Sequence, residues 1–598
     1  MENNRPIPPR PQLHGYINAA GILLFSVSVA VVLMTCYPYS MWNLESSDFF
    51  VWTSDYLRMK LAEKPGITAL LSDFLLQLFR WQGMGAVVVA VVLGLSAWGL
   101  VAAQRVACRL APCGWQLPVG VLLPALVFMY APFQLQLHLE TLFFSWSLWF
   151  LLSFRRLWAG LLWLLVASFL MSWIFQMAAW ALVVVFAFCY RLRGAGPSAA
   201  RLLMGVVLSV LMVYALNAWV GFIPFDDRWI PSSVPSQFLV LYILLSVVAL
   251  VVLPFWGKGR KFPSGHPLGG RWMRIAGILL SAVACCAAVA WVVPVGGDRD
   301  LVRQEQVYRL ADMAGNKQWR EILSAYSSNE VEHNRMTQTY ALLAEWMTGA
   351  LPQRVLDYNV NGSGDLVFQQ NARYDCRNFE RCLYDCLEMW DAAFYQAYEM
   401  GIKCRNGMGF LAMRNMARYA ILAGNVPVAH QCLDQLFRSL TYRHWAREWR
   451  QVAENAPQRQ DIPVHDSLPL RNTRSFTGIY SLGIELQEEY RHDPVNQYVL
   501  DGALVAFLLD GQLSHFVELL AASGAYDGKR LPGIYAEAMA MIAAGEPLEQ
   551  GRQLRERFLY DVRYDLDYRQ WRQSSVSGIV EQSSKNSYWE YYARHWQQ

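Results

Sequence analysis

The sequence predicts an all-α protein in two parts: a polytopic transmembrane helical domain of about nine spans over residues 1–295, then an α-solenoid of helical repeats over residues 296–598. Three observations predict it. Long apolar runs fill the first half. Residues 1–295 carry 19 Lys and Arg but nine Asp and Glu, whereas residues 296–598 carry 32 and 38. Glycines recur at 34-residue spacing in the second half. With 55% hydrophobic and 16% charged residues, the composition excludes a disordered chain and argues against a wholly soluble one.

Nine apolar runs approach the roughly 20 residues that are needed to cross about 30 Å of hydrocarbon. They lie at residues 16–37, 83–104, 117–133, 137–154, 157–173, 174–190, 202–221, 237–256 and 275–295. The uncharged stretch 157–190 would be about 51 Å long as a single helix, which is too long for one crossing. We therefore expect a hairpin that turns near Trp173–Gln176.

Basic residues between the runs orient the chain, because cytoplasmic loops are enriched in Lys and Arg. Arg105 and Arg109, Arg155 and Arg156, and the cluster from Lys258 to Arg274 mark such loops. The N-terminus is then cytoplasmic, and residues 38–82 and 296–598 are outside. In a bacterium this predicts an inner-membrane protein with a periplasmic C-terminal domain. The net charge of +4 gives no indication of nucleic-acid binding.

The first outward loop, residues 38–82, is predicted to form two amphipathic helices on the membrane surface. The first runs from Asp48 to about Lys64, and Pro65-Gly66 ends it. Helical spacing of apolar residues predicts the second; they are Ile67, Leu70, Leu71, Phe74, Leu75 and Leu78. We expect Glu63 and Asp73 to lie on the polar sides of these helices, in water.

Carboxylates and cations gather at the outward ends of the spans. Glu45 and Asp48 follow the first span, and Glu140 lies at the edge of the fourth. Acids near a membrane are costly and often functional, although helix capping and solvation also explain each of them. The outward cations can bind a phosphate group or extend toward lipid headgroups; they are Arg58, Lys60, Lys64, Arg80 and Arg228.

This layout resembles the GT-C glycosyltransferase superfamily, membrane enzymes that use polyprenyl-phosphate-linked sugars. The resemblance covers about residues 15–154: a large first external loop with two surface helices, a carboxylate after the first span and an acidic second loop. It implies Asp48 as the essential carboxylate, with Glu45 as the alternative, and a second acidic site at Glu140. His138-Leu139-Glu140 stands where metal-using members have Asp-x-Asp or Asp-x-Glu. A divalent metal at His138 and Glu140 therefore stays open.

The chemistry of such an enzyme fits these residue types. A carboxylate such as Asp48 can take the proton of the acceptor hydroxyl, and cations can stabilise the departing phosphate. The expected partners are membrane lipids, a polyprenyl-linked donor, and a protein or peptide held by the second half. Sugar, acceptor and metal dependence stay undetermined.

Repeats are predicted in the second half. Five helices rich in Ala and Leu end at a glycine, namely Gly315, Gly349, Gly424, Gly511 and Gly545. The spacing is 34 residues from the first to the second and from the fourth to the fifth, which is the tetratricopeptide period. Such repeats form a concave surface that binds peptides or proteins, or they brace the membrane domain.

A non-enzymatic alternative also fits the sequence: a membrane-anchored repeat scaffold for an envelope assembly or export complex. The whole chain further resembles an uncharacterised bacterial family that joins a polytopic domain to helical repeats. Five external cysteines, an odd number, are expected mainly as buried thiols, with one disulfide as the alternative; they are Cys376, Cys382, Cys386, Cys404 and Cys432.

Overall fold

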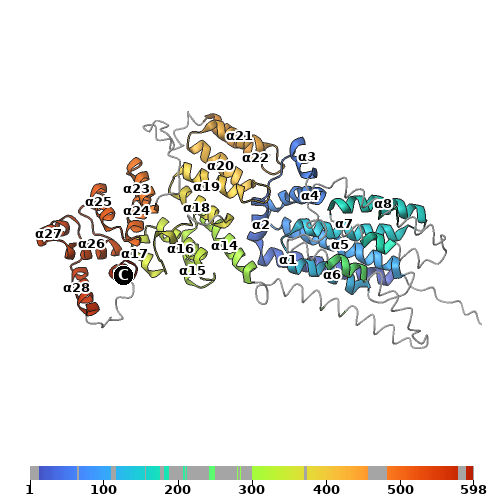
Figure 1. The fold of residues 1–598 in the computed structure, drawn as a ribbon, viewed down its shortest axis with the longest axis horizontal. Helices are drawn as coiled ribbons and strands as arrows, with labels where there is room; N and C mark the ends of the chain where they lie inside the picture. The colour runs from blue at the N-terminus through green and yellow to red at the C-terminus, as the bar shows by residue number, and fades with distance from the viewer. Residues whose placement is uncertain are drawn as a thin grey trace, which may run out of the picture. The chain divides into compact units, whose positions relative to one another are not determined.

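The computed structural model describes residues 12–62, 66–108, 116–154, 156–174, 181–186, 207–208, 210–211, 241–248, 279, 283, 299–368, 373–455, 481–576 and 587–596. Every named regular element within these residues is a helix, which confirms the predicted all-α class (Figure 1). The chain divides into two compact units. The first is Met1–Val302 with Arg438–Thr441, and the second is Arg303–Phe437 with Tyr442–Gln598.

The first unit begins with a long helix, four shorter ones and four further long helices. They are α1 (Gln12–Cys36), α2 (Pro38–Ser46), α3 (Ser54–Ala62), α4 (Gly66–Leu76), the 3-10 helix η1 (Gln77–Arg80), α5 (Met84–Cys108), α6 (Gln116–Tyr130), α7 (Leu135–Ser153) and α8 (Leu157–Ile174). The short elements α2 to η1 occupy the predicted first loop. The two amphipathic helices expected there correspond to α3 and α4.

Two helical stretches of the described residues are long and apolar enough to cross a membrane. They are Asn18–Cys36 in α1 and Met84–Val106 in α5, and they match the first two predicted spans. Gly120–Tyr130 and Trp158–Leu170 are apolar but shorter. The predicted spans at 174–190, 202–221, 237–256 and 275–295 lie wholly or mostly outside the described residues. The number of nine spans therefore stays a prediction.

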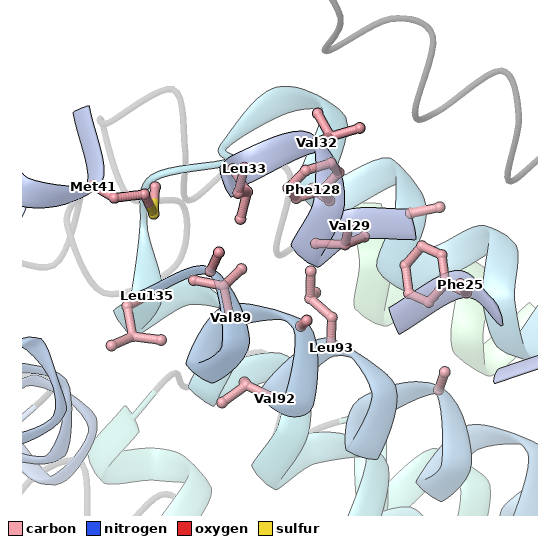
Figure 2. Close-up of a cluster of buried hydrophobic side chains, with 14 of the residues drawn as sticks. Phe25, Val29, Val32, Leu33, Met41, Val89, Val92, Leu93, Phe128 and Leu135 are labelled. Atoms are coloured by element: carbon pink, nitrogen blue, oxygen red, sulfur yellow. The ribbon is translucent and has the colours of Figure 1, made fainter. Parts of the chain in front are cut away.

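Helix α5 is the central element of the first unit, because α1, α6 and α7 all pack against it. Figure 2 shows the apolar cluster where they meet, with Phe25 and Leu33 of α1 facing Leu93 of α5 and Phe128 of α6. All four of these side chains are fully buried. Leu135 at the start of α7 belongs to the same cluster.

Two glycines allow this close packing. A Cβ atom added to Gly94 would lie 2.2 Å from Oγ of Ser26 on α1. One added to Gly99 would lie 3.1 Å from Cβ of Ser145 on α7. Small residues at helix contacts are typical of membrane helices, since dispersion contacts at short range must replace the hydrophobic effect in lipid.

The outer faces of these helices are apolar and exposed. Leu23 and Leu24 of α1 are each 65% exposed, and Trp158 of α8 is 71% exposed. Val91 and Trp98 of α5 are also exposed. Soluble monomers rarely expose contiguous apolar surface of this kind, whereas lipid chains would cover it. This surface therefore supports membrane association of the first unit.

The second unit consists of short helices joined by tight turns. They are α14 (Arg299–Gly315), α15 (Trp319–Ser327), α16 (Arg335–Met347), α17 (Leu351–Arg354), η2 (Val355–Asp357), η3 (Ser363–Asp365), α18 (Tyr374–Cys386), α19 (Trp390–Ile402), α20 (Phe410–Leu422), α21 (Val426–Phe437), α22 (Arg443–Asn455), α23 (Leu482–His492), α24 (Gln497–Leu509), α25 (Leu513–Ser523), α26 (Gly533–Gly545), α27 (Leu548–Arg557), α28 (Arg563–Val576) and α29 (Tyr588–Trp596). From α18 to α22 each helix packs on the next (Figure 1).

The same turn ends several helices of the second unit. After α16, Gly349 has φ +75°, and the Ala350 N–H donates to the Glu345 carbonyl at 2.9 Å. This left-handed residue with a six-to-one hydrogen bond is the Schellman motif. Gly424 and Gly511 adopt the same conformation after α20 and α24, as the sequence indicates. Gly315 and Gly545 instead close their helices without it.

Two turns of this kind carry a residue other than glycine. Lys317 has φ +57° after α14, and Glu388 has φ +63° after α18. The six-to-one bonds are present in both turns, with Gln318 N–H to Met313 O at 2.9 Å and Met389 N–H to Tyr384 O at 2.9 Å. The turn therefore recurs where the sequence has no glycine to mark it.

Helices distant in the sequence also meet within the second unit. The Trp346 indole N–H donates to the Tyr498 carbonyl at 2.7 Å, and a Cβ added to Gly502 would lie 1.8 Å from that indole. The Ser363 hydroxyl donates to Asp510 at 2.7 Å. A linear stack, in which each repeat contacts only its neighbours, does not predict these contacts. The solenoid thus stays a prediction, and the helical pairs are what the structure shows.

The five cysteines of the second unit are free thiols, as the sequence favours. Cys376, Cys382, Cys404 and Cys432 are buried, and Cys386 is half-buried. Burial raises the pKa of the Cys376 and Cys432 thiols to about 11, so both stay protonated at neutral pH.

The exposed residue Glu388 tests the turn energetics. Glu388→Gly should stabilise the protein by about 0.5–1 kcal/mol, because glycine removes the steric cost of the left-handed conformation. Gly349→Ala should destabilise it by a similar amount through φ alone, since an added Cβ meets nothing within 4 Å. Thermal unfolding of the purified full chain in detergent measures both. A lower melting temperature for Glu388→Gly would contradict the assignment.

Candidate functional site

Helix α4 buries its polar face, whereas a surface helix in contact with water is expected to bury its apolar face. Its small and polar side chains are the buried ones, including Thr68, Ser72 and Asp73, whereas Ile67 and Leu71 are only half-buried. The expected position of Asp73 in water is therefore wrong, because its side chain is fully buried. Protein rather than water covers the polar face of α4.

The end of this polar face binds α3 through an ion pair. The Lys60 ammonium lies 3.4 Å from Oδ2 of Asp73, and both side chains are almost fully buried. The Tyr56 hydroxyl lies 2.9 Å from the same carboxylate oxygen and 2.8 Å from the Phe49 carbonyl. Tyr56 thereby connects the ion pair to the segment that directly follows Asp48.

The beginning of the same face binds α7. The Thr68 hydroxyl donates to Oε1 of Glu140 at 3.3 Å, and the Gln136 amide donates to the same oxygen at 2.9 Å. Glu140 is 7% exposed and Thr68 is fully buried. Helix α4 therefore holds Glu140 at one end and the Lys60–Asp73 pair at the other.

Two more predicted site residues lie close in sequence to this arrangement and are also buried. Glu45 lies in the last turn of α2 and is fully buried, and Asp48 follows that helix and is 4% exposed. The Asp48 N–H donates to the Glu45 carbonyl at 3.1 Å, which holds the two residues in one turn. We call the buried polar side chains on α4 and those bound to them the α4 polar cluster: Tyr56, Lys60, Thr68, Ser72, Asp73 and Glu140. Asp48 precedes Phe49, whose carbonyl accepts a hydrogen bond from Tyr56 of this cluster.

His138, the proposed partner of Glu140 for a metal, is fully buried. Its Nε2 lies 3.4 Å from the Pro132 carbonyl, and its Nδ1 has no hydrogen-bond partner among the described residues. Within the part of the chain that the structure describes, no group of three His, Cys, Asp or Glu side chains is placed to hold a metal ion. A metal held by His138 and Glu140 therefore stays a prediction.

The predicted phosphate-binding cations fall into three groups. Arg58 on α3 is exposed. Lys60 is occupied by Asp73, and the Arg80 guanidinium donates to the Thr441 carbonyl, which belongs to the same unit. Lys64 and Arg228 lie outside the described residues. Among the five predicted cations, Arg58 is thus the one that the structure shows exposed.

Sequence reasoning missed Asp73 and Tyr56 as members of the cluster. A usable signal was present: Thr68, Ser72 and Asp73 alternate with leucines in a helix next to a membrane. In lipid, the polar face of such a helix turns toward the protein, because unpaired polar groups are costly in hydrocarbon.

Comparison with known proteins gives one family. A model described as a family of unknown function (DUF6057) matches residues 15–594. No curated protein and no solved structure matches the chain. The match agrees with the expected resemblance of the whole chain to an uncharacterised family, and it gives no support to the glycosyltransferase or tetratricopeptide resemblance.

The Lys60–Asp73 pair tests whether the polar face of α4 is buried. Asp73→Asn should destabilise the protein by about 3–5 kcal/mol, since it leaves the Lys60 charge buried without its counter-ion. The double variant Lys60→Met with Asp73→Leu should recover most of that loss. Asp55→Asn, at an exposed position on α3, is the control and should change little. Thermal unfolding in detergent measures all three, and an unaltered Asp73→Asn protein would show that Asp73 faces water.

Proposed function

This chain belongs to DUF6057, a family of unknown function. From its own residues we propose that it is a membrane glycosyltransferase. It would use a polyprenyl-phosphate-linked sugar or oligosaccharide at the periplasmic face of a bacterial inner membrane. The observation that carries the proposal is the burial of three predicted site carboxylates, Glu45, Asp48 and Glu140, beside an apolar helical unit.

Burying a carboxylate costs free energy unless hydrogen bonds or an opposite charge compensate it, so such burial is often retained for a function. Glu140 and Asp73 have hydrogen-bond and ionic partners that fix them on α4. Asp48 lies next to Phe49, whose carbonyl is bound by Tyr56. Glu140, Asp73 and the backbone beside Asp48 are thus held in place, and these carboxylates lie out of bulk water, which is a setting that suits general-base catalysis.

The proposed reaction forms a bond between the acceptor oxygen and C1 of the sugar. The Asp48 carboxylate takes the proton of the acceptor hydroxyl, with Glu45 as the alternative base. The bond between C1 and the phosphate oxygen breaks, and the electron pair stays on the lipid phosphate. Arg58 is the described cation assigned to that developing charge, and Lys64 and Arg228 remain candidates. Glu140 orients the acceptor from α7.

The membrane placement rests on the first unit. Its two span-length helices and its exposed apolar faces support embedding in lipid. The nine-span topology, with the N-terminus in the cytoplasm and residues 296–598 in the periplasm, follows from the distribution of basic residues. The α4 polar cluster would then lie at the outer membrane face, where lipid-linked donors present their sugars.

The second unit is proposed to present the acceptor polypeptide or a partner protein. Its repeated helical pairs, closed by the same left-handed turn, support a tetratricopeptide-like surface. The non-enzymatic scaffold remains the competing function, and glycan profiling of cells that lack the protein separates the scaffold from the enzyme.

The first prediction from the proposed function concerns topology. The test labels single cysteines with a membrane-impermeant maleimide in spheroplasts whose inner membrane is intact. One cysteine replaces Arg320 in the second unit, and the other replaces Ser264 in the expected cytoplasmic loop. Arg320→Cys should be labelled and Ser264→Cys should be labelled only after lysis. The unmodified protein, whose thiols in the second unit are mostly buried, is the control. Labelling of position 264 alone in intact spheroplasts would reverse the orientation.

The second prediction concerns Asp48. Asp48→Asn keeps the size of the side chain but removes the base, so glycan transfer should fall by about 10²–10⁴-fold. Asp55→Asn, an exposed acid in the same loop, should retain activity. The measurement is glycan profiling of envelope proteins and lipids in cells that carry the wild type, either variant or a deletion, with the amount of inserted protein checked by blotting.

Two outcomes would contradict the enzyme. Asp48→Asn cells could produce the same glycans as the wild type at equal protein levels. Alternatively, the deletion itself could leave every glycan unchanged while affinity purification through residues 296–598 recovers a defined envelope complex, which would establish the scaffold.

A further inference from the structure

The second unit contains a polar pocket that the proposed reaction does not use. Its volume is about 740 Å³, within the range of about 300–1,000 Å³ that is typical of small-molecule sites. The end of α15, one side of α16 and the segment from the end of α17 to η3 form its walls. The lining comes entirely from residues 326–365, so the pocket lies within one unit.

One wall of this pocket is aromatic. The rings of Tyr326 and His333 are stacked, with centroids 4.1 Å apart and planes within 5°. The ring of Tyr358 lies 5.7 Å from that of Tyr326. His333 is exposed, so the stacked pair presents the outer face of the imidazole. The His333 Nε2 atom lies 2.9 Å from the Tyr326 carbonyl, which holds the imidazole in this orientation.

Four of the five charged groups of the pocket form two ion pairs, and the fifth, Asp357, leaves the lining with one net negative charge. Arg335 lies 3.4 Å from Asp365, and Arg354 lies 3.0 Å from the buried Glu345. The Tyr358 hydroxyl also donates to Glu345 at 3.1 Å. Burial and this carboxylate raise the pKa of Tyr358, so the hydroxyl stays protonated. Because both cations are paired and the net charge is negative, the pocket is unsuited to attract a phosphate or another anion, and the polar walls are unsuited to a lipid chain.

The remaining polar lining consists largely of side-chain amides, from Asn334, Gln338, Asn359 and Asn361. Each amide offers both donors and an acceptor. The segment that carries them is held in place, because the Gln338 amide donates to the Asn359 carbonyl at 2.8 Å and the Asn361 N–H donates to Asp365 at 2.7 Å. Such pre-organisation lowers the entropy cost of binding.

We propose that this pocket binds a short, uncharged saccharide. Sugar hydroxyls donate and accept hydrogen bonds at once, which amide side chains match, and the C–H face of a pyranose ring packs on an aromatic face such as that of His333. The inference stands on the pocket alone and does not depend on glycosyl transfer by the first unit.

The test is direct binding to the full chain, purified in a detergent without a sugar headgroup. The probes are three neutral trisaccharides (maltotriose, mannotriose and chitotriose), a sulfated heparin disaccharide and the tripeptide Ala-Ala-Ala, each titrated by calorimetry. At least one neutral trisaccharide should bind at one site per chain. His333→Ala should weaken it about tenfold by removing the ring face, and His333→Phe should retain it.

The matched control is His515→Ala. His515 is also an exposed histidine stacked on an aromatic ring, with its centroid 5.3 Å from that of Phe507, but it does not line the pocket. This variant should bind as the wild type does, and thermal unfolding should show that all variants are folded.

The proposal is overturned if none of the three trisaccharides binds, if His333→Ala binds as tightly as the wild type, or if the tripeptide or the sulfated disaccharide binds instead. Because the assay measures binding and not transfer, Asp48→Asn should bind as the wild type does. A variant that loses glycan transfer but still binds the trisaccharide, or one that loses binding but still transfers glycan, therefore shows that the two proposals stand or fail separately.

Discussion

The close approach of α5 to its two neighbours is the constraint on which the first unit depends. Gly94 and Gly99 lack side chains at the points where α1 and α7 cross α5, so both helices pack at backbone distance. The contact of Gly99 with Ser145 helps to position α7, whose first two turns carry His138 and Glu140. The position of Glu140 against Thr68 of α4 therefore depends in part on Gly99, a glycine on another helix.

The α4 polar cluster shows what happens to charge in such a setting. A buried Lys60 and a buried Asp73 are each costly alone, and together they offset part of that cost at 3.4 Å. An ion pair of this kind contributes less to stability than to defining a single arrangement, because a helix that rotated or shifted would separate the charges. We infer that the pair fixes the rotation of α4 and with it the place of the neighbouring carboxylates.

Much of the helical architecture was accessible from the sequence, and the exceptions have physical causes. The glycine turns at 349, 424 and 511 were predictable because glycine alone adopts positive φ without cost. Lys317 and Glu388 adopt it under the constraint of the surrounding helices, which no local pattern indicates. The orientation of α4 was inverted because an amphipathic pattern identifies two faces but not which of them meets water. The contact of Trp346 with Gly502 spans more than 150 residues and leaves no periodic signal.

The burial of the polar face of α4 has a consequence for how the protein folds during translation. The two charged partners of this face are synthesised at different times. Lys60 precedes α4 in the chain, whereas Glu140 follows the end of the helix at Leu76 by 64 residues. At a synthesis rate of about 5–20 residues per second, several seconds pass between the two. During that interval the Thr68 hydroxyl lacks the Glu140 carboxylate that accepts its hydrogen bond, and we infer that this face of α4 packs only after α7 has emerged. The order of translation thus sets the order of assembly.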